Sequence, residues 1–278
     1  MWTATDRMWG EVTPAERLRA VTRRNVDEER LAIEAADALA GFASEPASLV
    51  VACRRVLAHH RSCGPLWWVC ARILAAPDAT LGARDAVQLL ETDRTADRLG
   101  ATLPLLDEGQ VVAVVGWPEA VDLAMVERLD VDAVALRVDG ANPAPALRRR
   151  FSDRGVRIVD AWDPTLTDVV RFLVLASAIG PDHCLVPAGT IDAIDTLGSA
   201  VRDVWVVGGV GRVLPARIYD VVRQAALTSA SPDDDAPVEE LAISRVDCIA
   251  GPRGVQRASE AALRSDCPVV PELLRPLD

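Results

Sequence analysis

The chain has 278 residues, half of them apolar, so it is long enough to bury one large core or two modest ones. Its formal net charge of −11 leaves no sequence-wide basic surface for a phosphate backbone, which argues against nucleic acid as a partner. Arginine supplies all 30 basic residues and lysine none, which excludes catalysis through a lysine Schiff base. The arginine- and alanine-rich composition suits a bacterium of high genomic GC content.

The chain carries no signal of export or membrane insertion. Its first residues are charged, without the apolar core of a signal peptide, and its longest apolar run, residues 172–179, is too short to cross a bilayer. Six cysteines are spread along the chain without CxxC spacing. We therefore expect a cytoplasmic protein with no membrane contact, with reduced thiols and without disulfides.

The first part of the chain alternates helical periodicity with breaks. Residues 1–24 look like a frayed leader, and residues 25–108 are expected to form a helical N-terminal domain. Helices are expected over residues 26–42, 46–60 and 66–76, followed from residue 83 by one long helix or two short ones.

From residue 109 onward, apolar runs alternate with helix-length amphipathic segments. The runs cover residues 111–115, 132–138, 156–162, 183–188 and 204–207. Because most of them are continuously apolar, they read as strands buried on both faces. Residues 109–278 are thus predicted to form a Rossmann-like α/β domain, a mostly parallel sheet with helices on both faces.

The end of the chain is less regular. After a helix expected over residues 218–227, the acidic, proline-containing segment near 229–240 is predicted to be a mobile loop. A strand around residues 245–251 and a short helix at 258–265 are expected to follow.

Parallel sheets bind ligands at the carboxyl ends of their strands, which defines a candidate site. The candidates there are Gly116, Trp117, Asp139, Asp163, Gly189, Thr190, Gly208, Gly209, Gly211 and Arg212. The glycine-rich turn before Arg212 offers backbone N–H groups to a phosphate, with the arginine as a partner for the same group. The structural alternative is that these glycines only allow a tight turn and bind no ligand.

Several charged residues have both a functional and a structural interpretation. Arg61 precedes a predicted helix. It is expected either to contact a ligand phosphate or to be a solvated surface charge. For Asp139, Asp163 and Asp192 the functional interpretation is binding of sugar hydroxyls or action as a base. The structural interpretation is capping of turns and helices. The group of His59, His60, Cys63 and Cys70 lacks the spacing of a zinc site, so neither a metal nor a cofactor is expected.

The order and spacing of these segments resemble a known superfamily: the alpha, beta and delta subunits of translation initiation factor 2B, with the methylthioribose-1-phosphate and ribose-1,5-bisphosphate isomerases. Residues 93–116 look like the family's long helix, acidic turn and first strand, and residues 136–163 like its second and third strands. Residues 183–209 are similar to the strand that ends in Gly-Ala-Asp and the strand after it. His60 to Leu66 stand where the family has an Arg-Pro-Thr loop.

The departures from the family decide the expected function. The resemblance places the isomerases' catalytic cysteine after the first strand and their aspartate at the end of the fourth, where this chain has Gly116 and Gly189. Losing one general acid or base costs about 10²- to 10⁴-fold in rate, so the family's isomerase chemistry is not expected.

The favoured interpretation is a homodimer that binds a phosphorylated sugar or nucleotide at the strand ends. One alternative is a sugar-phosphate isomerase with reassigned groups, such as Asp163 or Asp192 as base. The other is a dimeric interaction scaffold without a ligand.

Overall fold

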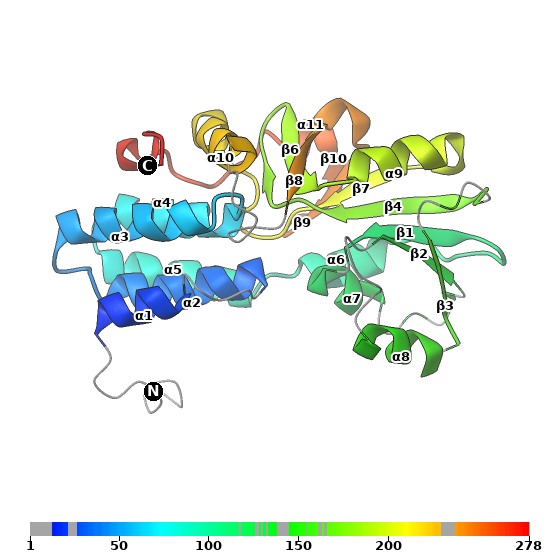
Figure 1. Cartoon of the computed structure of the whole chain (residues 1–278), viewed down its shortest axis with the longest axis horizontal. Helices are drawn as coiled ribbons and strands as arrows, with labels where there is room; N and C mark the ends of the chain where they lie inside the picture. Colours follow the sequence, from blue (N-terminus) through cyan, green and yellow to red (C-terminus); the bar gives the residue numbers. More distant parts are fainter. Residues whose placement is uncertain are drawn as a thin grey trace.

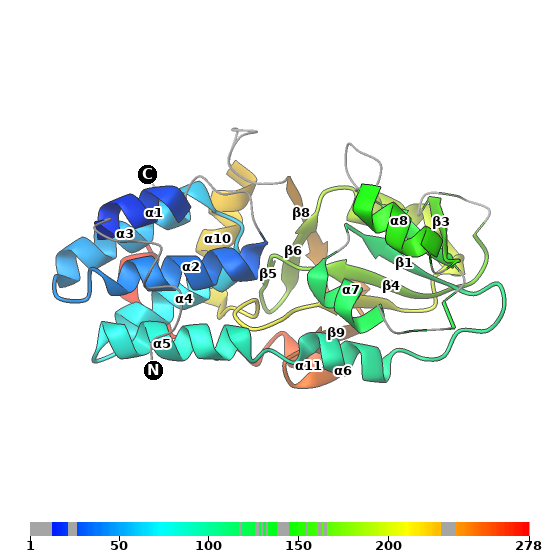
Figure 2. The same ribbon diagram turned by 90° about the horizontal axis from the view of Figure 1, so that it is seen from below.

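The computed structural model of the chain describes two packed regions that lie side by side along the long axis of the molecule (Figures 1 and 2). It describes residues 13–21, 27–116, 118–125, 128, 130–131, 133–137, 145–153, 155–160, 163, 166–228 and 237–277.

The first region is a bundle of five helices. These are α1 (Pro14–Val21), α2 (Glu28–Ala40), α3 (Pro46–His59), α4 (Gly64–Ala75) and α5 (Ala79–Glu91). Helix α4 is the core of the bundle, because almost all of its side chains are buried, Trp67 and Trp68 completely. Its high apolar content is what a helix surrounded on all sides requires.

Helix α1 lies inside the segment predicted to be a frayed leader, so that prediction was wrong for residues 14–21. Thr13 and Glu16 form a capping box: the Thr13 N–H donates to Glu16 Oε2 at 2.9 Å, and the Glu16 N–H donates to Thr13 Oγ1 at 3.3 Å. Leu18 and Val21 then bury themselves against the bundle. The signal T-x-x-E before an apolar stripe was present in the sequence.

The second region is built on a seven-stranded sheet in the order β10-β9-β7-β4-β1-β2-β3. Its strands are β1 (Val111–Val115), β2 (Ala133–Arg137), β3 (Arg157–Asp160), β4 (Val169–Leu175), β7 (Val204–Val207), β9 (Cys248–Gly251) and β10 (Gly254–Arg257). All run parallel except β10, which pairs antiparallel with β9.

Helices cover both faces of this sheet (Figure 1). Helices α6 (Thr95–Thr102) and α7 (Glu119–Met125) pack on one face, and α9 (Thr190–Leu197) and α11 (Ala258–Ala261) on the other. Helix α8 (Pro145–Asp153) connects β2 to β3. The prediction of a Rossmann-like, mostly parallel sheet with helices on both faces is confirmed.

The strand predicted at residues 183–188 exists but does not join the parallel sheet. It is β6 (His183–Pro187), in a separate antiparallel sheet with β5 (Ala178–Ile179) and β8 (Val238–Ala242). Only three residues separate β5 from β6, and a connection that short allows antiparallel pairing alone. The central position in the parallel sheet is taken instead by β4, which the sequence interpretation missed.

The structure describes only part of the segment near 229–240, which was predicted to be a mobile loop. Residues 229–236 lie outside the described residues, while residues 238–240 are the first part of strand β8. Their side chains are held: Glu239 Oε1 accepts the N–H of Ile191, and Glu240 pairs with Arg223.

The end of the chain returns to the helical bundle. Helix α10 (Ala216–Thr228) contributes Ile218 and Val222 to the same core as α2 to α5, and the tail adds Val270 and Leu273 (Figure 2). The bundle core is therefore completed by residues far outside 25–108. None of the described helices is both long and apolar enough to cross a membrane.

We expect Phe172→Ala, in the centre of β4, to lower the free energy of unfolding by about 3 to 5 kcal/mol, because it leaves a cavity at a fully buried position. Leu105→Ala is the matched control: this side chain is 82% exposed, so its loss should change stability by less than about 0.5 kcal/mol. Urea unfolding measures both, and equal losses would contradict the central position of β4.

Candidate functional site

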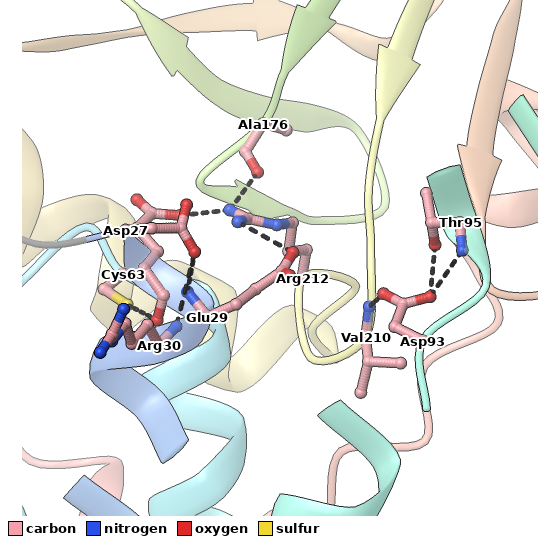
Figure 3. A network of polar contacts seen from close by, with 10 residues as sticks. Asp27, Glu29, Arg30, Cys63, Asp93, Thr95, Ala176, Val210 and Arg212 are labelled. Atoms are coloured by element: carbon pink, nitrogen blue, oxygen red, sulfur yellow. Dashed lines mark hydrogen bonds and ion pairs between the residues drawn. The ribbon is translucent and has the colours of Figure 1, made fainter. Parts of the chain in front are cut away.

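The carboxyl ends of the parallel strands face the helical bundle. Gly116 follows β1, Ala176 and Ser177 follow β4, and the glycine segment 208–211 follows β7. The N–H of Gly64, the first residue of α4, donates to the carbonyl of Ser177 at 2.9 Å, so helix and strand end meet directly. A polar network of residues from both regions fills this junction (Figure 3).

Arg212 lies at the centre of the network and is fully buried. Its Nη1 donates to the carbonyl of Ala176 at 2.9 Å and to Oε2 of Glu28, and its Nη2 lies 3.6 Å from Oε1 of Glu29 (Figure 3). Burial alone lowers the pKa of Arg212, but the attraction of Glu28 and Glu29 outweighs it and raises the pKa above its ordinary value. The guanidinium is thus already paired with two carboxylates of the chain itself.

Asp93 takes the position at which the sequence suggested a bound anion. Its Oδ2 accepts the N–H of Val210 at 2.8 Å, while its Oδ1 accepts the N–H and hydroxyl of Thr95, at 2.8 and 2.7 Å, at the start of α6. A side chain at Gly209 would place its Cβ 2.6 Å from Asp93 Oδ2. Glycine is required there because the carboxylate approaches the backbone so closely.

Glu29 is the titrating residue of the network. Burial raises its pKa, Arg212 opposes that shift, and the neighbouring Asp27 and Asp93 add to it. Asp27 itself caps α2, where its carboxylate accepts the N–H groups of Glu29 at 3.1 Å and Arg30 at 3.4 Å. The carboxyl groups of Asp27, Glu29 and Asp93 are thus close enough for their charges to affect one another.

Three predicted site residues have local structural roles. Arg61 Nε donates to the carbonyl of Ala58 at 3.0 Å and closes the end of α3. Gly189 has φ +85° before α9, where a left-handed backbone is needed, and Thr190 is buried with its hydroxyl 2.5 Å from the carbonyl of Pro187. Both follow β6, so they lie outside the parallel sheet.

The remaining predicted residues are dispersed. Asp192 is exposed in the first turn of α9, and Asp163 follows β3 with a half-buried side chain. Trp117 and Asp139 lie outside the described residues. Gly208, Gly209 and Gly211 are brought together, and all three line a pocket at the end of β7.

The residue at the end of the fourth strand also differs from the one expected from the sequence. The fourth strand in chain order is β4, not the segment at 183–188, so the position at its end is Ser177 rather than Gly189. A serine hydroxyl is no substitute for a carboxylate as a general base. After β1 the chain has Gly116, at φ +73°, which has no side chain to donate a proton.

Glu28, Glu29 and Asp93 are the residues of the polar network that the sequence interpretation missed. They stand before or at helix starts, where an acidic residue is ordinary, so no local signal separates them from simple caps. Among the described residues, no three His, Cys, Asp or Glu side chains are arranged to hold a metal ion.

A helical bundle joined to a Rossmann-like domain through its strand ends defines the class of fold. No family model and no curated protein matches the sequence. Solved structures with the same fold include eIF2B beta from Chaetomium thermophilum, at 14% identity over 95% of this chain and 94% of that chain, with a TM-score of 0.68.

Two further structures are similar. The tetrameric eIF2B-beta2-delta2 complex from C. thermophilum has 16% identity over 90% of this chain and 92% of that chain, with a TM-score of 0.70. The 5-methylthioribose 1-phosphate isomerase from Pyrococcus horikoshii OT3 has 16% identity over 90% and 86%, with a TM-score of 0.54. The resemblance inferred from the sequence is thus confirmed at the level of the fold.

Arg212→Met should lower the free energy of unfolding by about 1 to 3 kcal/mol, because Glu28, Glu29 and the carbonyl of Ala176 would lose their charged hydrogen-bond donor. The control is Arg245→Met, which removes the same charge from a more exposed pair with Asp195 and should cost less than about 1 kcal/mol. Chemical denaturation measures both, and equal effects would refute the central role of Arg212.

Glu29→Gln should change the pH dependence of stability. Because burial raises the pKa of Glu29, the stabilising contribution of its proton is fully present below about pH 4.3, the unfolded value, and is lost as the pH rises through the folded pKa. The glutamine variant has no such proton. The melting temperature of the wild type should therefore fall relative to the variant as the pH rises from about 4.3 through the raised folded pKa.

Glu108→Gln, at an exposed turn residue, is the control and should keep a constant difference from the wild type across this range. A constant difference for Glu29→Gln as well, or one of opposite slope, would show that the folded state does not raise the pKa of Glu29.

Proposed function

We propose that this chain is an eIF2B-like assembly subunit without isomerase chemistry, which acts in the cytoplasm as a homodimer. The observation that carries the proposal is the identity of the residues at the ends of β1 and β4, Gly116 and Ser177. An aldose–ketose isomerisation needs a group that removes a proton and one that returns it. Neither position supplies such a group.

The carboxylates of the chain that already occupy the junction support the same proposal. The phosphorylated sugar or nucleotide expected beside Arg212 would compete there with Glu28 and Glu29, which already neutralise the guanidinium. The N–H of Val210 is likewise taken by Asp93. An anion placed among three carboxylates meets like charge, which disfavours binding.

The assembly role draws support from one of the similar structures, because the eIF2B-beta2-delta2 complex is a tetramer of subunits with this fold. The chain also exposes isolated large apolar side chains, among them Leu105, Leu123 and Leu263. Five of its six cysteines are buried as thiols, a state that a reducing compartment preserves.

A sugar-phosphate isomerase with reassigned residues is the second candidate, and one observation favours it. Glu29 is partly exposed at the strand ends and has a raised pKa, as a general acid–base residue requires. It suits this role better than Asp163 or Asp192, which lie away from the junction.

Two measurements separate the candidates. With ribose 1,5-bisphosphate and methylthioribose 1-phosphate as substrates, we expect no turnover above background, because the acid–base pair is missing. Light scattering after size exclusion should give twice the chain mass of 29.8 kDa. A monomeric mass would contradict the assembly role, and turnover abolished by Glu29→Gln would establish the reassigned isomerase instead.

A further inference from the structure

The helical bundle carries a groove of about 380 Å³ on its surface, between α1 and α3. Nine residues line it: three of α1, five of α3, and Phe42 from the turn that joins α2 to α3. All of them belong to the bundle, and none takes part in the polar network at the strand ends. The groove is therefore separate from the junction with the sheet.

The lining residues on each helix follow its periodicity. On α1 they occupy positions i, i+3 and i+4, from Ala15 to Arg19. On α3 they occupy positions i, i+1, i+4, i+5 and i+8, from Ala47 to Arg55. Residues with this spacing share one face of a helix, so two helix faces line the groove along its length.

The two helices run in the same direction, from the outer end of the bundle toward the sheet (Figure 1). The start of α1 meets the end of α2, because a Cβ added at Gly41 would lie 2.7 Å from Cγ of Pro14. Helix α3 begins shortly after that point, at Pro46. The last lining residues of both helices, Arg19 and Arg55, therefore lie toward the same end of the groove.

The middle of the groove is apolar and open to solvent. Leu18 and Ala52 are buried in its floor, whereas the side chain of Val51 is 66% exposed. The hydroxyl of Ser48 is already used, since it donates to Oε2 of Glu45 at 2.8 Å. An apolar ligand that covers Val51 would be stabilised by the hydrophobic effect without breaking this bond.

The charges of the groove are positive, although the whole chain is acidic. Among the described residues that line it, the charged ones are Arg19 and Arg55. The side chain of Arg55 is exposed and has no ion-pair or hydrogen-bond partner in the part of the chain that the structure describes. An anion at this end of the groove would thus meet a guanidinium whose charge no carboxylate offsets.

The dimensions of the groove favour a small molecule over a protein partner. Its volume falls within the range of about 300 to 1,000 Å³ that is usual for small-molecule sites. Its nine lining residues are far fewer than the roughly 20 to 30 that a stable protein interface takes from each side. From Ala47 to Arg55 the helix rises by about 12 Å, which suits an alkyl chain of medium length.

We propose that this groove binds a medium-chain carboxylic acid, with its alkyl chain along the apolar middle and its carboxylate at Arg55 and Arg19. A guanidinium binds a carboxylate through two parallel hydrogen bonds, which fixes the head group. Each methylene group removed from water adds to the affinity. This binding goes beyond the assembly role and does not depend on it.

Calorimetric titration of the full chain at neutral pH tests the proposal, with decanoate below its micelle concentration, octanoate and octanol as ligands. We expect decanoate to bind most tightly and to raise the melting temperature. Octanoate should bind up to about tenfold more weakly, because it buries two methylene groups fewer. Octanol should bind a further tenfold or so more weakly, because it has no charge to pair with an arginine.

Two variants locate the ligand. Arg55→Gln should weaken decanoate about tenfold or more, through the loss of a charged hydrogen bond. Ala47→Phe should weaken all three ligands, because its ring fills the groove. Both positions are exposed, so both variants should fold, which an unchanged melting temperature checks. The matched control is Arg217→Gln, an exposed arginine of α10 outside the groove lining, which should leave the affinity unchanged.

The proposal is overturned if decanoate does not bind at millimolar concentration or lowers the melting temperature, as a detergent does. Octanol that binds as tightly as octanoate, or binding that Ala47→Phe leaves unchanged, would also overturn it. If Val51→Asp halves the mass measured by light scattering, a second copy covers the groove and the ligand does not. The mass of the wild-type chain is independent of decanoate binding, so the two proposals fail separately.

Discussion

A guanidinium cannot be buried without a counter-charge, and Arg212 finds it in Glu28 and Glu29 at the start of α2. Because Arg212 belongs to the segment after β7 and the two glutamates to the helical bundle, this pairing fixes the bundle against the strand ends. Asp93 acts in the same direction, since it caps α6 and holds the backbone of Val210. Bundle and sheet are thus joined through charges and caps as well as through the shared core that α10 and the tail complete.

The same carboxylates govern what the strand ends can bind. An edge built to hold an anion needs free donors and positive charge, whereas here the N–H of Val210 is bonded to Asp93 and the charge of the buried arginine is offset by Glu28 and Glu29. The chain also has no carboxylate, thiol or imidazole at the positions of Gly116 and Ser177, after β1 and β4. These features agree with the proposed function, in which the charged residues at this edge serve the structure.

The sequence predicted the fold well where the signal was local and continuous. Apolar runs located β1, β2, β3 and β7, but periodicity carries no information on strand partners, so β6 was placed in the wrong sheet and β4 was overlooked. Choosing between them required the three-residue connection from β5 to β6 to be recognised as a hairpin. The site was harder, because the acid that meets Val210 is 117 residues away in the chain, and no local pattern reports such a contact.

The glycine segment after β7 was correctly predicted to allow close approach to the backbone, but the approaching group was wrongly predicted to be a ligand. Its glycines do free the backbone for close approach, but at Gly209 the approaching group is the chain's own carboxylate, which explains the residue without any ligand. Gly211 is constrained differently. Its φ is +80°, and a Cβ added there would lie against Pro65 and Trp68. Both glycines are therefore explained by contacts within the chain, so the glycine-rich turn in the sequence does not by itself identify a ligand site.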